Sequence, residues 1–404
     1  MLEHCDYREA RDRMLSGIVP VGTERIPLAE CTGRILAGEV RAVRDVPPFD
    51  RSAFDGYAFR SSDTAGASEK KPAVLSVTDY IAAGHLPKGA VSPGCAARIM
   101  TGAPVPEGAD AVIRYESTRF TEKTVEIPEE VPAGSNIVTR GEDVVQGQEL
   151  AQAGTVFDPG LAGILASQGA FLPEVYRKVR VGIISTGDEV QEDPGSLGAG
   201  RIYDANRYSL TLAVKTAGCE PLYFGNPADS VREIAEALRA AFTVCDAVLL
   251  TGGVSAGDYD LTPDAMAEAG VEILARGLSM KPGMAGAYGV KDGKAVCALS
   301  GNPAACMTGY YLVALPALRK LSGRTEFLLP EFDVRIRMPF SKKGKISRIL
   351  RGRLVHRGGE VWMEVPRKQG NAMLHSFYGC DLLAEVPGGV TAQDGMVLRG
   401  IYIG

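Results

Sequence analysis

Three segments of the chain combine small residues with carboxylates or amides, a composition typical of loops that bind phosphate groups and metal ions. They are Ser185-Thr186-Gly187-Asp188-Glu189, Thr251-Gly252-Gly253-Val254-Ser255-Ala256-Gly257-Asp258-Tyr259-Asp260 and Leu299-Ser300-Gly301-Asn302-Pro303. Glycines let backbone N–H groups approach an anion, and Mg²⁺ prefers one or two carboxylates plus substrate phosphate oxygens. A helix that begins at Pro303 would add the positive end of its dipole. The segments therefore indicate a site for an anionic ligand and a divalent cation.

Each segment also has a purely structural interpretation. The first could form a helix N-cap or a turn. Thr262 could cap a helix that begins at Pro263, which would leave Asp258 and Asp260 as solvated turn residues. Lys281, in Lys281-Pro282-Gly283, adds a cation near the glycine-rich segments, although a lone lysine is usually a solvated surface group.

A Pro-led loop at 47–58 is a further candidate. It carries two carboxylates, an arginine and a hydroxyl, namely Asp50, Asp55, Arg51 and Ser52. Such charges are costly to bury unless they meet a ligand, a metal or each other. Simple surface exposure is the alternative.

The elements that must position these segments are predicted from hydrophobic patterning. Apolar runs without a polar face occur at 179–185, 247–250 and 295–299, with a further extended run at 220–224. They alternate with helical patterns at 207–217, 230–241, 263–269 and 304–321. Such runs are typical of parallel strands covered on both faces, so the region is predicted to be a doubly wound α/β unit. Ligands bind beyond the carboxyl ends of strands in such sheets, where all three segments lie.

The remainder of the chain is predicted to be mainly β. A helix over 3–16 and an extended stretch over 26–31 open the chain. Residues 73–160 alternate short β-like runs with Pro and Gly, without a long helix. After Gly323 short alternating strands return, with Gly358-Gly359 as a hairpin turn, which indicates a small barrel or sandwich.

The composition excludes several classes of protein. The chain has 404 residues, 45% of them hydrophobic and 23% charged, which fits a globular protein of two to four domains at about 150 residues each. Its 44 Lys and Arg against 49 Asp and Glu give a net charge of −5, so nucleic acid is not the expected partner. The segment 342–357 nevertheless carries seven cations and no acid, either as a solvated strand face or to attract anionic ligands.

The cysteines and histidines do not have the spacing of a zinc site. The eight cysteines include no C-x-x-C and the four histidines no H-x-x-x-H, so reduced thiols are expected. The N-terminus lacks the apolar core of a signal peptide, and no apolar run approaches the roughly 18 residues of a membrane span. We therefore expect a cytoplasmic protein without a membrane partner.

In their order along the chain, the motifs resemble the molybdopterin molybdenumtransferase family, which includes the gephyrin E domain. The matching strings are Ser52-Ala53-Phe54-Asp55-Gly56-Tyr57-Ala58, Arg98-Ile99-Met100-Thr101-Gly102-Ala103-Pro104-Val105-Pro106-Glu107-Gly108-Ala109-Asp110, Gly141-Glu142-Asp143, Ser185-Thr186-Gly187-Asp188-Glu189, Tyr203-Asp204-Ala205-Asn206-Arg207, Thr251-Gly252-Gly253-Val254-Ser255-Ala256-Gly257 and Gly301-Asn302-Pro303. Each string alone is moderately specific, but their ordered combination over nearly the whole chain is very specific.

The resemblance implies an elongated homodimer of four-domain subunits whose active cleft is completed by the other subunit. Residues 1–44 and 145–177 would form a linker and dimerisation domain, 45–144 an inserted mainly-β domain, 178–325 the doubly wound molybdopterin-binding domain, and 326–404 a C-terminal β barrel. The implied reaction is insertion of molybdate into adenylylated molybdopterin, with Mg²⁺-assisted release of AMP.

The resemblance also implies the site residues. The catalytic positions would be Asp55, Thr101, Asp143, Glu189 and Asp260, with Glu189 and Asp260 holding the metal. The substrate-binding positions would be Ser185, Thr186, Gly187, Asp204, Asn206, Gly252, Gly253, Ser255, Lys281, Gly301, Asn302, Pro303, Arg351 and Ser376. Of these, Arg351 and Ser376 would lie on the barrel surface that approaches the partner's cleft.

The sequence departs from the family at four positions near this site. The family usually has a second lysine at Met284, proline at Ser300, aspartate at Ser230 and arginine at Val138. Loss of a charge-assisted anion contact weakens binding by about tenfold or more. Two alternatives therefore stay open: a relative that inserts tungstate or uses another pterin nucleotide, and a protein that binds the pterin or a partner without chemistry.

Overall fold

The computed structural model describes residues 1–192, 195–254, 261–337 and 343–404. These residues form two compact units, each described by itself. The first comprises Met1–Gly38, Ala153–Pro159 and Leu172–Gly404, and the second comprises Glu39–Gln152 and Gly160–Phe171. None of the described helices is both long and apolar enough to cross a membrane.

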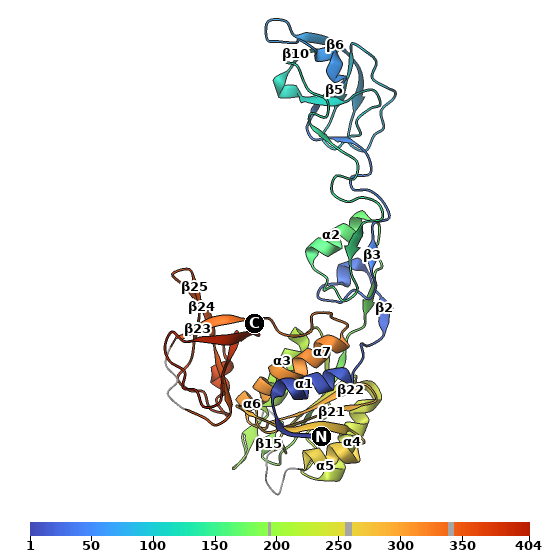
Figure 1. Cartoon of the computed structure of the whole chain (residues 1–404). Coiled ribbons are helices and arrows are strands. Elements are labelled where there is room, and N and C mark those ends of the chain that lie inside the picture. The colour runs from blue at the N-terminus through green and yellow to red at the C-terminus, as the bar shows by residue number, and fades with distance from the viewer. Residues whose placement is uncertain (193–194, 255–260, 338–342) are drawn as a thin grey trace. The chain divides into compact units, whose positions relative to one another are not determined.

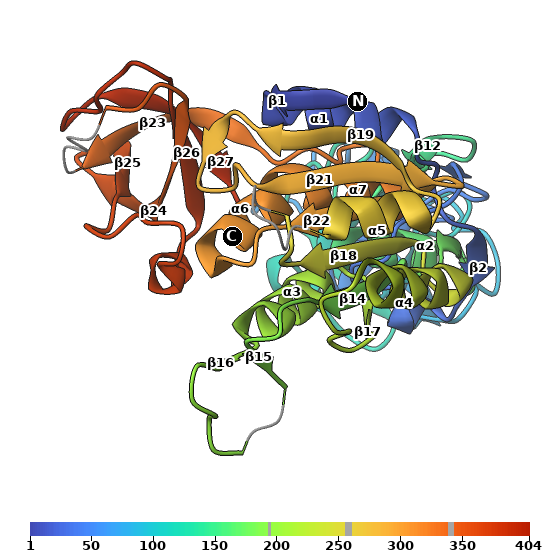
Figure 2. The same ribbon diagram turned by 90° about the horizontal axis from the view of Figure 1, so that it is seen from below.

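A seven-stranded sheet forms the centre of the first unit, in the order β1-β19-β21-β22-β18-β14-β17 (Figure 2). The strands are β1 (Leu2–Cys5), β14 (Arg180–Ser185), β17 (Glu220–Tyr223), β18 (Ala247–Thr251), β19 (Glu272–Leu278), β21 (Gly286–Lys291) and β22 (Lys294–Leu299). The four strands from β22 to β17 run parallel and correspond to the three predicted apolar runs and the extended run at 220–224. The predicted doubly wound α/β fold is thus confirmed.

Helices cover both faces of this sheet. On one face lie α1 (Tyr7–Ser16), α3 (Ala205–Thr216) and a continuous helical stretch of α6 (Pro303–Gly309), the π-helical η4 (Tyr310–Ala314) and α7 (Leu315–Leu321). The other face carries α4 (Val231–Val244) and α5 (Thr262–Glu268), as Figure 2 shows. In α4 the buried Ile234, Leu238 and Ala241 recur at helical spacing, so one stripe packs on the sheet.

Three strands of the sheet have no clear signal in the sequence. The strand β1 has four residues and pairs in parallel with β19, while β21 runs antiparallel to both β19 and β22. Two glycines in β21 weaken its β pattern. The predicted opening helix begins only at Tyr7, because Asp6 caps it by accepting from the backbone N of Arg8 at 2.8 Å.

The prediction of an extended stretch over 26–31 is wrong for the middle of that stretch. It contains a 3-10 turn, η1 (Leu28–Glu30). Nearby, β2 (Thr23–Arg25) pairs with β13 (Glu174–Tyr176), and further along β15 (Val190–Gln191) pairs with β16 (Ile202–Tyr203). These short ladders rely on long-range partners that local sequence patterns do not reveal.

The C-terminal part of the first unit is a closed β barrel, which confirms the prediction of a small barrel. Its five strands are β23 (Glu331–Arg337), β24 (Ser347–Arg357), β25 (Glu360–Glu364), β26 (Leu382–Val386) and β27 (Val397–Tyr402), with a 3-10 turn η5 (Leu374–Phe377). The two-residue strand β20 (Met280–Lys281) pairs with β24 outside the closed ring. A pairing of β24 with β26 closes the sheet. Gly358 and Gly359 have φ angles of 55° and 82°, as the tight turn between β24 and β25 requires.

The second unit is mainly β, as predicted, and contains a six-stranded sheet in the order β8-β5-β7-β6-β10-β9 (Figure 1). The strands are β5 (Gly56–Phe59), β6 (Ala73–Ile81), β7 (Cys95–Ile99), β8 (Ala111–Arg114), β9 (Arg119–Phe120) and β10 (Thr124–Ile127). Short ladders join β3 (Val40–Arg41) to β12 (Glu149–Ala151) and β4 (Arg51–Ser52) to β11 (Ile137–Val138). The 3-10 turns are η2 (Ser61–Thr64) and η3 (Tyr115–Ser117), and α2 (Pro159–Ser167) crosses the boundary between the two units.

Candidate functional site

The loops that follow β14, β18 and β22 are tied together at the carboxyl edge of the sheet. Thr186 donates from its backbone N and its Oγ1 to the carbonyl of Thr251, at 2.8 and 3.0 Å. The backbone N of Gly252 donates to Leu299 O at 3.1 Å, so this N–H is already used and does not face an anion. Three of the predicted site segments therefore meet at one place.

Glycine is required at Gly252 because two loops touch its backbone. Its φ is 100°, and a Cβ there would lie 2.6 Å from both the carbonyl O and the Oγ1 of Thr186. A Cβ on Gly253 would lie 2.6 Å from Thr262 Oγ1. Thr262 does not cap α5, because its hydroxyl donates instead to Gly252 O at 3.0 Å. The glycines therefore serve close packing of the loops.

Asp204 and Asn206 connect α3 to the same edge. Asp204 is buried, accepts from Arg207 N at 2.9 Å as the N-cap of α3, and also accepts from the Ser185 hydroxyl. Asn206 is 8% exposed and donates from Nδ2 to Gly301 O at 2.8 Å. Its Oδ1 is buried without a hydrogen-bond partner among the described residues. An unpaired buried acceptor is costly, so a ligand N–H there would be stabilised.

Acidic side chains gather beside the first loop. Asp188 N donates to Asp229 Oδ2 at 3.3 Å, and Glu189 is exposed on the same loop. Burial raises the pKa of Asp229, and the negative charges of Asp188 and Glu189 raise it further. No group of three metal-binding side chains occurs in the described residues. Mg²⁺ commonly uses one or two carboxylates together with substrate phosphates, so these donors fit that ion.

Sequence reasoning missed the residues that follow β17. Besides Asp229, they include Asn226, whose Nδ2 donates to the carbonyls of Gly187 and Val190 at 3.2 and 3.3 Å. At the end of β17, the hydroxyl of Tyr223 donates to Glu192, and its ring lies 3.7 Å from the guanidinium carbon of Arg207. The signal was available, because residues at the carboxyl end of a parallel strand are site candidates by position alone.

Several predicted residues lie elsewhere or outside the described residues. Ser255 and Asp260 belong to the residues that the structure does not describe. Asn302 and Pro303 begin α6 next to Gly301, and Lys281 is exposed in β20 beside β24. At a departure from the family, Ser230 caps α4 by accepting from Glu233 N at 3.2 Å. The hydroxyl therefore replaces the capping function that an aspartate would have.

The expectation that Arg351 and Ser376 lie on the barrel surface is wrong. Their exposed fractions are 0% and 4%, and Arg351 Nε donates to Ser376 Oγ at 2.7 Å. Arg351 also donates from Nη2 to Gly370 O at 3.2 Å, while its backbone N donates to Gln369 Oε1 at 2.9 Å. Burial lowers the pKa of Arg351 to about 10. The loop that holds Gln369 and Gly370 covers this arginine, which explains its burial.

Asp55 and Thr101 lie together in the second unit. Asp55 Oδ1 accepts from the backbone N and the Oγ1 of Thr101 at 2.7 and 2.6 Å. These two hydrogen bonds, the hydroxyl's first, lower the pKa of Asp55. Asp143 is exposed, with its backbone N donating to Val46 O at 3.0 Å, and no hydrogen bond among the described residues joins it to that pair.

A Thr101→Val substitution should raise the pKa of Asp55 toward its ordinary value of 3.8. The stability that ionised Asp55 contributes is present above that value and is lost as the pH falls through its lowered pKa in the folded protein. Wild type should therefore exceed the variant in stability at pH 7, and the difference should shrink in acid. Urea unfolding of both proteins at pH 7 and at acidic pH measures this difference in unfolding free energy.

A Thr118→Val variant is the control for that experiment, because the Thr118 hydroxyl donates only to the Tyr115 carbonyl within the described residues. Its effect should not depend on the carboxylate. A difference between wild type and Thr101→Val that stays constant down to strongly acidic pH would contradict the assignment.

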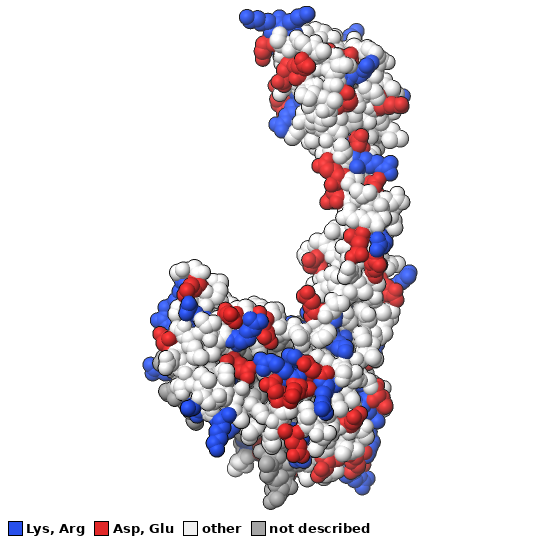
Figure 3. All heavy atoms as spheres, viewed as in Figure 1, with Lys and Arg blue, Asp and Glu red and all other residues white. Residues whose placement is uncertain are grey.

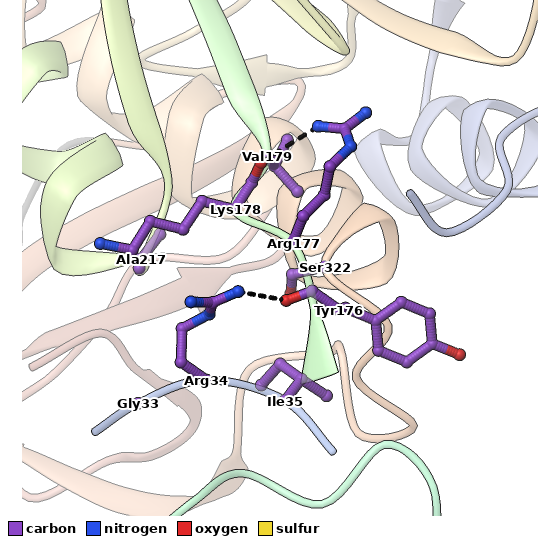
Figure 4. A pocket seen from close by; sticks show the side chains of 10 residues that line it. Gly33, Arg34, Ile35, Tyr176, Arg177, Lys178, Val179, Ala217 and Ser322 are labelled. Atoms are coloured by element: carbon purple, nitrogen blue, oxygen red, sulfur yellow. Dashed lines mark hydrogen bonds between the residues drawn. The ribbon is translucent and has the colours of Figure 1, made fainter. Parts of the chain in front are cut away.

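A small cavity at the opposite edge of the sheet does not belong to this site (Figure 4). It lies just before β14 and holds about 10 Å³, room for roughly one water. Arg34 donates to Tyr176 O at 2.8 Å, and Arg177 pairs with both carboxylate oxygens of Asp246 at 2.6 and 2.7 Å. Those arginines are already used within the fold.

Acidic side chains accompany the basic ones of the described part of the basic segment, 343–357. Figure 3 shows acidic and basic side chains interspersed over the barrel on the visible face. Arg357 in β24 pairs with Glu364 in β25 at 3.3 Å. Apart from the buried Arg351, this pattern favours the interpretation as a solvated strand face.

Comparisons with known proteins match nearly the whole chain. Residues 5–169 match the MoeA N-terminal region (domain I and II), and residues 182–320 match a probable molybdopterin binding domain. The chain is 33% identical over 377 residues to the molybdopterin molybdenumtransferase of Bacillus subtilis, covering 92% of this chain and 87% of that one. The enzyme of the same name from a Staphylococcus epidermidis strain is 33% identical over 346 residues, covering 86% and 83%.

A solved structure gives the same result. The molybdopterin biosynthesis protein MoeA from Pyrococcus horikoshii superimposes with a TM-score of 0.85 at 29% identity, covering 98% of each chain. Both the sequence and the fold therefore point to the same family.

Proposed function

The chain belongs to the molybdopterin molybdenumtransferase family, and from that premise we propose that it inserts molybdate into adenylylated molybdopterin with Mg²⁺-assisted release of AMP. The observation that carries the proposal is the meeting of three loops, after β14, β18 and β22, at the carboxyl edge of the sheet. This edge is where ligands of open α/β sheets bind.

We assign pterin binding to the surface that these three loops form at the carboxyl edge of the sheet. The unpartnered Asn206 Oδ1 would accept a hydrogen bond from a pterin N–H. Gly252, Gly253 and Gly301 let these loops pack closely together, which would hold Asn206 in place beside the pterin. Ser185 and Asp204 act as supports, since they bond to each other and to α3.

Mg²⁺ would be held by Glu189, with Asp188 and Asp229 close by, and when bound it would neutralise charge on the phosphate oxygens. Without the metal, Asp229 retains its proton to a higher pH than an ordinary carboxyl group, because burial and two like charges raise its pKa. The exposed Lys281 would attract the oxyanion. We place Asp260, as a second metal ligand, and Ser255 in the same proposal by family resemblance alone.

The proposal includes a cytoplasmic homodimer. Its cleft would combine the sheet edge of one subunit with Asp55, Thr101 and Asp143 of the other. The eight free cysteines fit a reducing compartment. Light scattering of the purified protein should give twice the mass of 42.8 kDa.

An insertion assay with purified protein tests the reaction. AMP should be released from adenylylated molybdopterin only when molybdate and Mg²⁺ are both present, and a chelator should abolish the release. AMP at the background rate would contradict the proposal. Tight pterin binding without release would favour the non-catalytic alternative, and competition with tungstate in the same assay would reveal a change of oxyanion.

A further inference from the structure

A second cavity opens near the same edge of the sheet. Its volume is about 310 Å³, within the range of small-molecule sites. It lies where β1 and β19 end, beside the residues that follow β18 and precede β21. The described residues that line it are Glu3, His4, Val254, Arg276, Gly277, Met284 and Ala285.

Arg276 supplies a cation to this cavity. It is exposed near the end of β19, where its neighbour in register on β1 is Glu3. Within the described part of the chain Arg276 makes no ion pair or hydrogen bond through its side chain, and the Glu3 carboxylate is not in ion-pair contact with it. By contrast, Arg8 pairs with Glu385 at 2.8 Å and Arg177 with Asp246 at 2.6 Å. Among the described residues, the guanidinium of Arg276 therefore has no partner that a ligand would have to displace.

The walls of the cavity are held together by contacts between neighbouring segments. The carbonyl of His4 accepts from the Ser279 hydroxyl, and a Cβ on Gly277 would lie 2.8 Å from His4 Nδ1. Leu278 N donates to Met284 O at 2.8 Å, which holds the segment after Lys281 against the end of β19. Arg276 therefore extends from a strand, and Met284 from a loop bonded to that same strand.

The two walls differ in chemistry. Val254 and Ala285 are apolar, and Met284 is an uncharged thioether that is 40% exposed. A cation on this side of the pocket therefore comes from Arg276 rather than from position 284. A guanidinium can hold two oxygens of a tetrahedral oxyanion at once, which an ammonium group cannot do with the same geometry.

We infer that Arg276 binds the oxyanion of a substrate in this cavity and supplies there the positive charge that Met284 lacks. The inference deepens the proposed function and rests on it. A tetrahedral oxyanion can come from two sources, molybdate itself or the phosphate of the nucleotide. Both present oxygens that accept from the five N–H donors of arginine.

Arg276→Ala should weaken oxyanion binding by roughly tenfold or more, the usual effect of losing a charge-assisted hydrogen bond. Calorimetric titrations with molybdate alone and with AMP alone distinguish the two sources, because only the ligand held by Arg276 should lose affinity. The matched control is Arg232→Ala, which removes another exposed cation, from α4, where it pairs with Glu236 at 2.9 Å. The control should leave both affinities unchanged.

A charge relocated across the cavity gives a second, independent test. The double variant Arg276→Ala with Met284→Lys should recover a substantial part of the lost affinity, because the ammonium would enter the same cavity from another lining position. Thermal unfolding of each variant shows whether the fold is intact. The inference is overturned if Arg276→Ala binds molybdate and AMP as tightly as Arg232→Ala does. It is also overturned if Met284→Lys restores none of the affinity lost in Arg276→Ala.

Failure of this inference and failure of the proposed function remain distinguishable. A wild type that releases AMP on insertion, together with an Arg276→Ala variant of unchanged affinity, contradicts only the role of Arg276. If the wild type releases no AMP, but the Arg276→Ala variant binds the oxyanion more weakly than the wild type does, only the reaction is contradicted. Wild-type protein that binds neither molybdate nor AMP contradicts both.

Discussion

Gly252→Ala should cost about 2–5 kcal/mol of unfolding free energy and abolish pterin binding. The new methyl carbon would lie 2.6 Å from two oxygen atoms of Thr186, and the φ of 100° is unfavourable for alanine. Relief requires the loop after β14 to move away from the loop after β18. That movement breaks the paired bonds from Thr186 to Thr251 O. Urea unfolding and pterin titration measure both effects.

A glycine in open space provides the control for this substitution. Gly395 has a φ of 78°, and a Cβ there would have no heavy atom within 4 Å. Gly395→Ala should therefore cost only the backbone contribution of about 1–2 kcal/mol and leave pterin binding intact. Equal losses of stability in the two variants would show that steric contact with Thr186 does not matter.

Glu189→Gln should reduce the rate of AMP release by roughly 10–100-fold or more and increase the Mg²⁺ concentration required. Glutamine keeps the size of the side chain but removes its charge, which the cation needs. Asp188 and Asp229 remain nearby, so residual activity at high Mg²⁺ is expected. Steady-state assays over a range of Mg²⁺ concentrations measure the change.

The matched control for Glu189→Gln is Glu236→Gln on the exposed face of α4. Glu236 pairs there only with Arg232 among the described residues, at 2.9 Å. This variant removes the same charge from the same unit and should keep the wild-type rate and Mg²⁺ requirement. A Glu189→Gln protein with unchanged Mg²⁺ dependence would remove Glu189 from the metal site.

Much of the fold could be predicted because its strongest signals are local. Three of the four parallel strands are continuous apolar runs, and the barrel strands follow an alternating pattern with a Gly-Gly turn between β24 and β25. The strands β1 and β21 could not be predicted, since each is short or rich in glycine. In addition, β1 pairs with β19, whose residues lie more than 250 positions further along the chain.

The site was partly predictable for the same reason. Segments at the ends of recognised strands, such as 185–189 and 251–254, do meet at one edge of the sheet. The buried state of Arg351 could not be read from sequence, because it depends on the loop that holds Gln369 and Gly370. The cation at Arg276 was missed because β19 itself was not recognised, so no strand end marked that position.

Hydrogen exchange with and without bound molybdopterin tests most directly whether the carboxyl edge of the sheet binds the pterin. Binding should protect backbone amides in the segments 185–190, 204–206, 251–254 and 300–302, and should leave those beside the small cavity at 33–35 and 176–178 unchanged. Protection confined to the second set, or absent from all four segments of the first, would contradict the account.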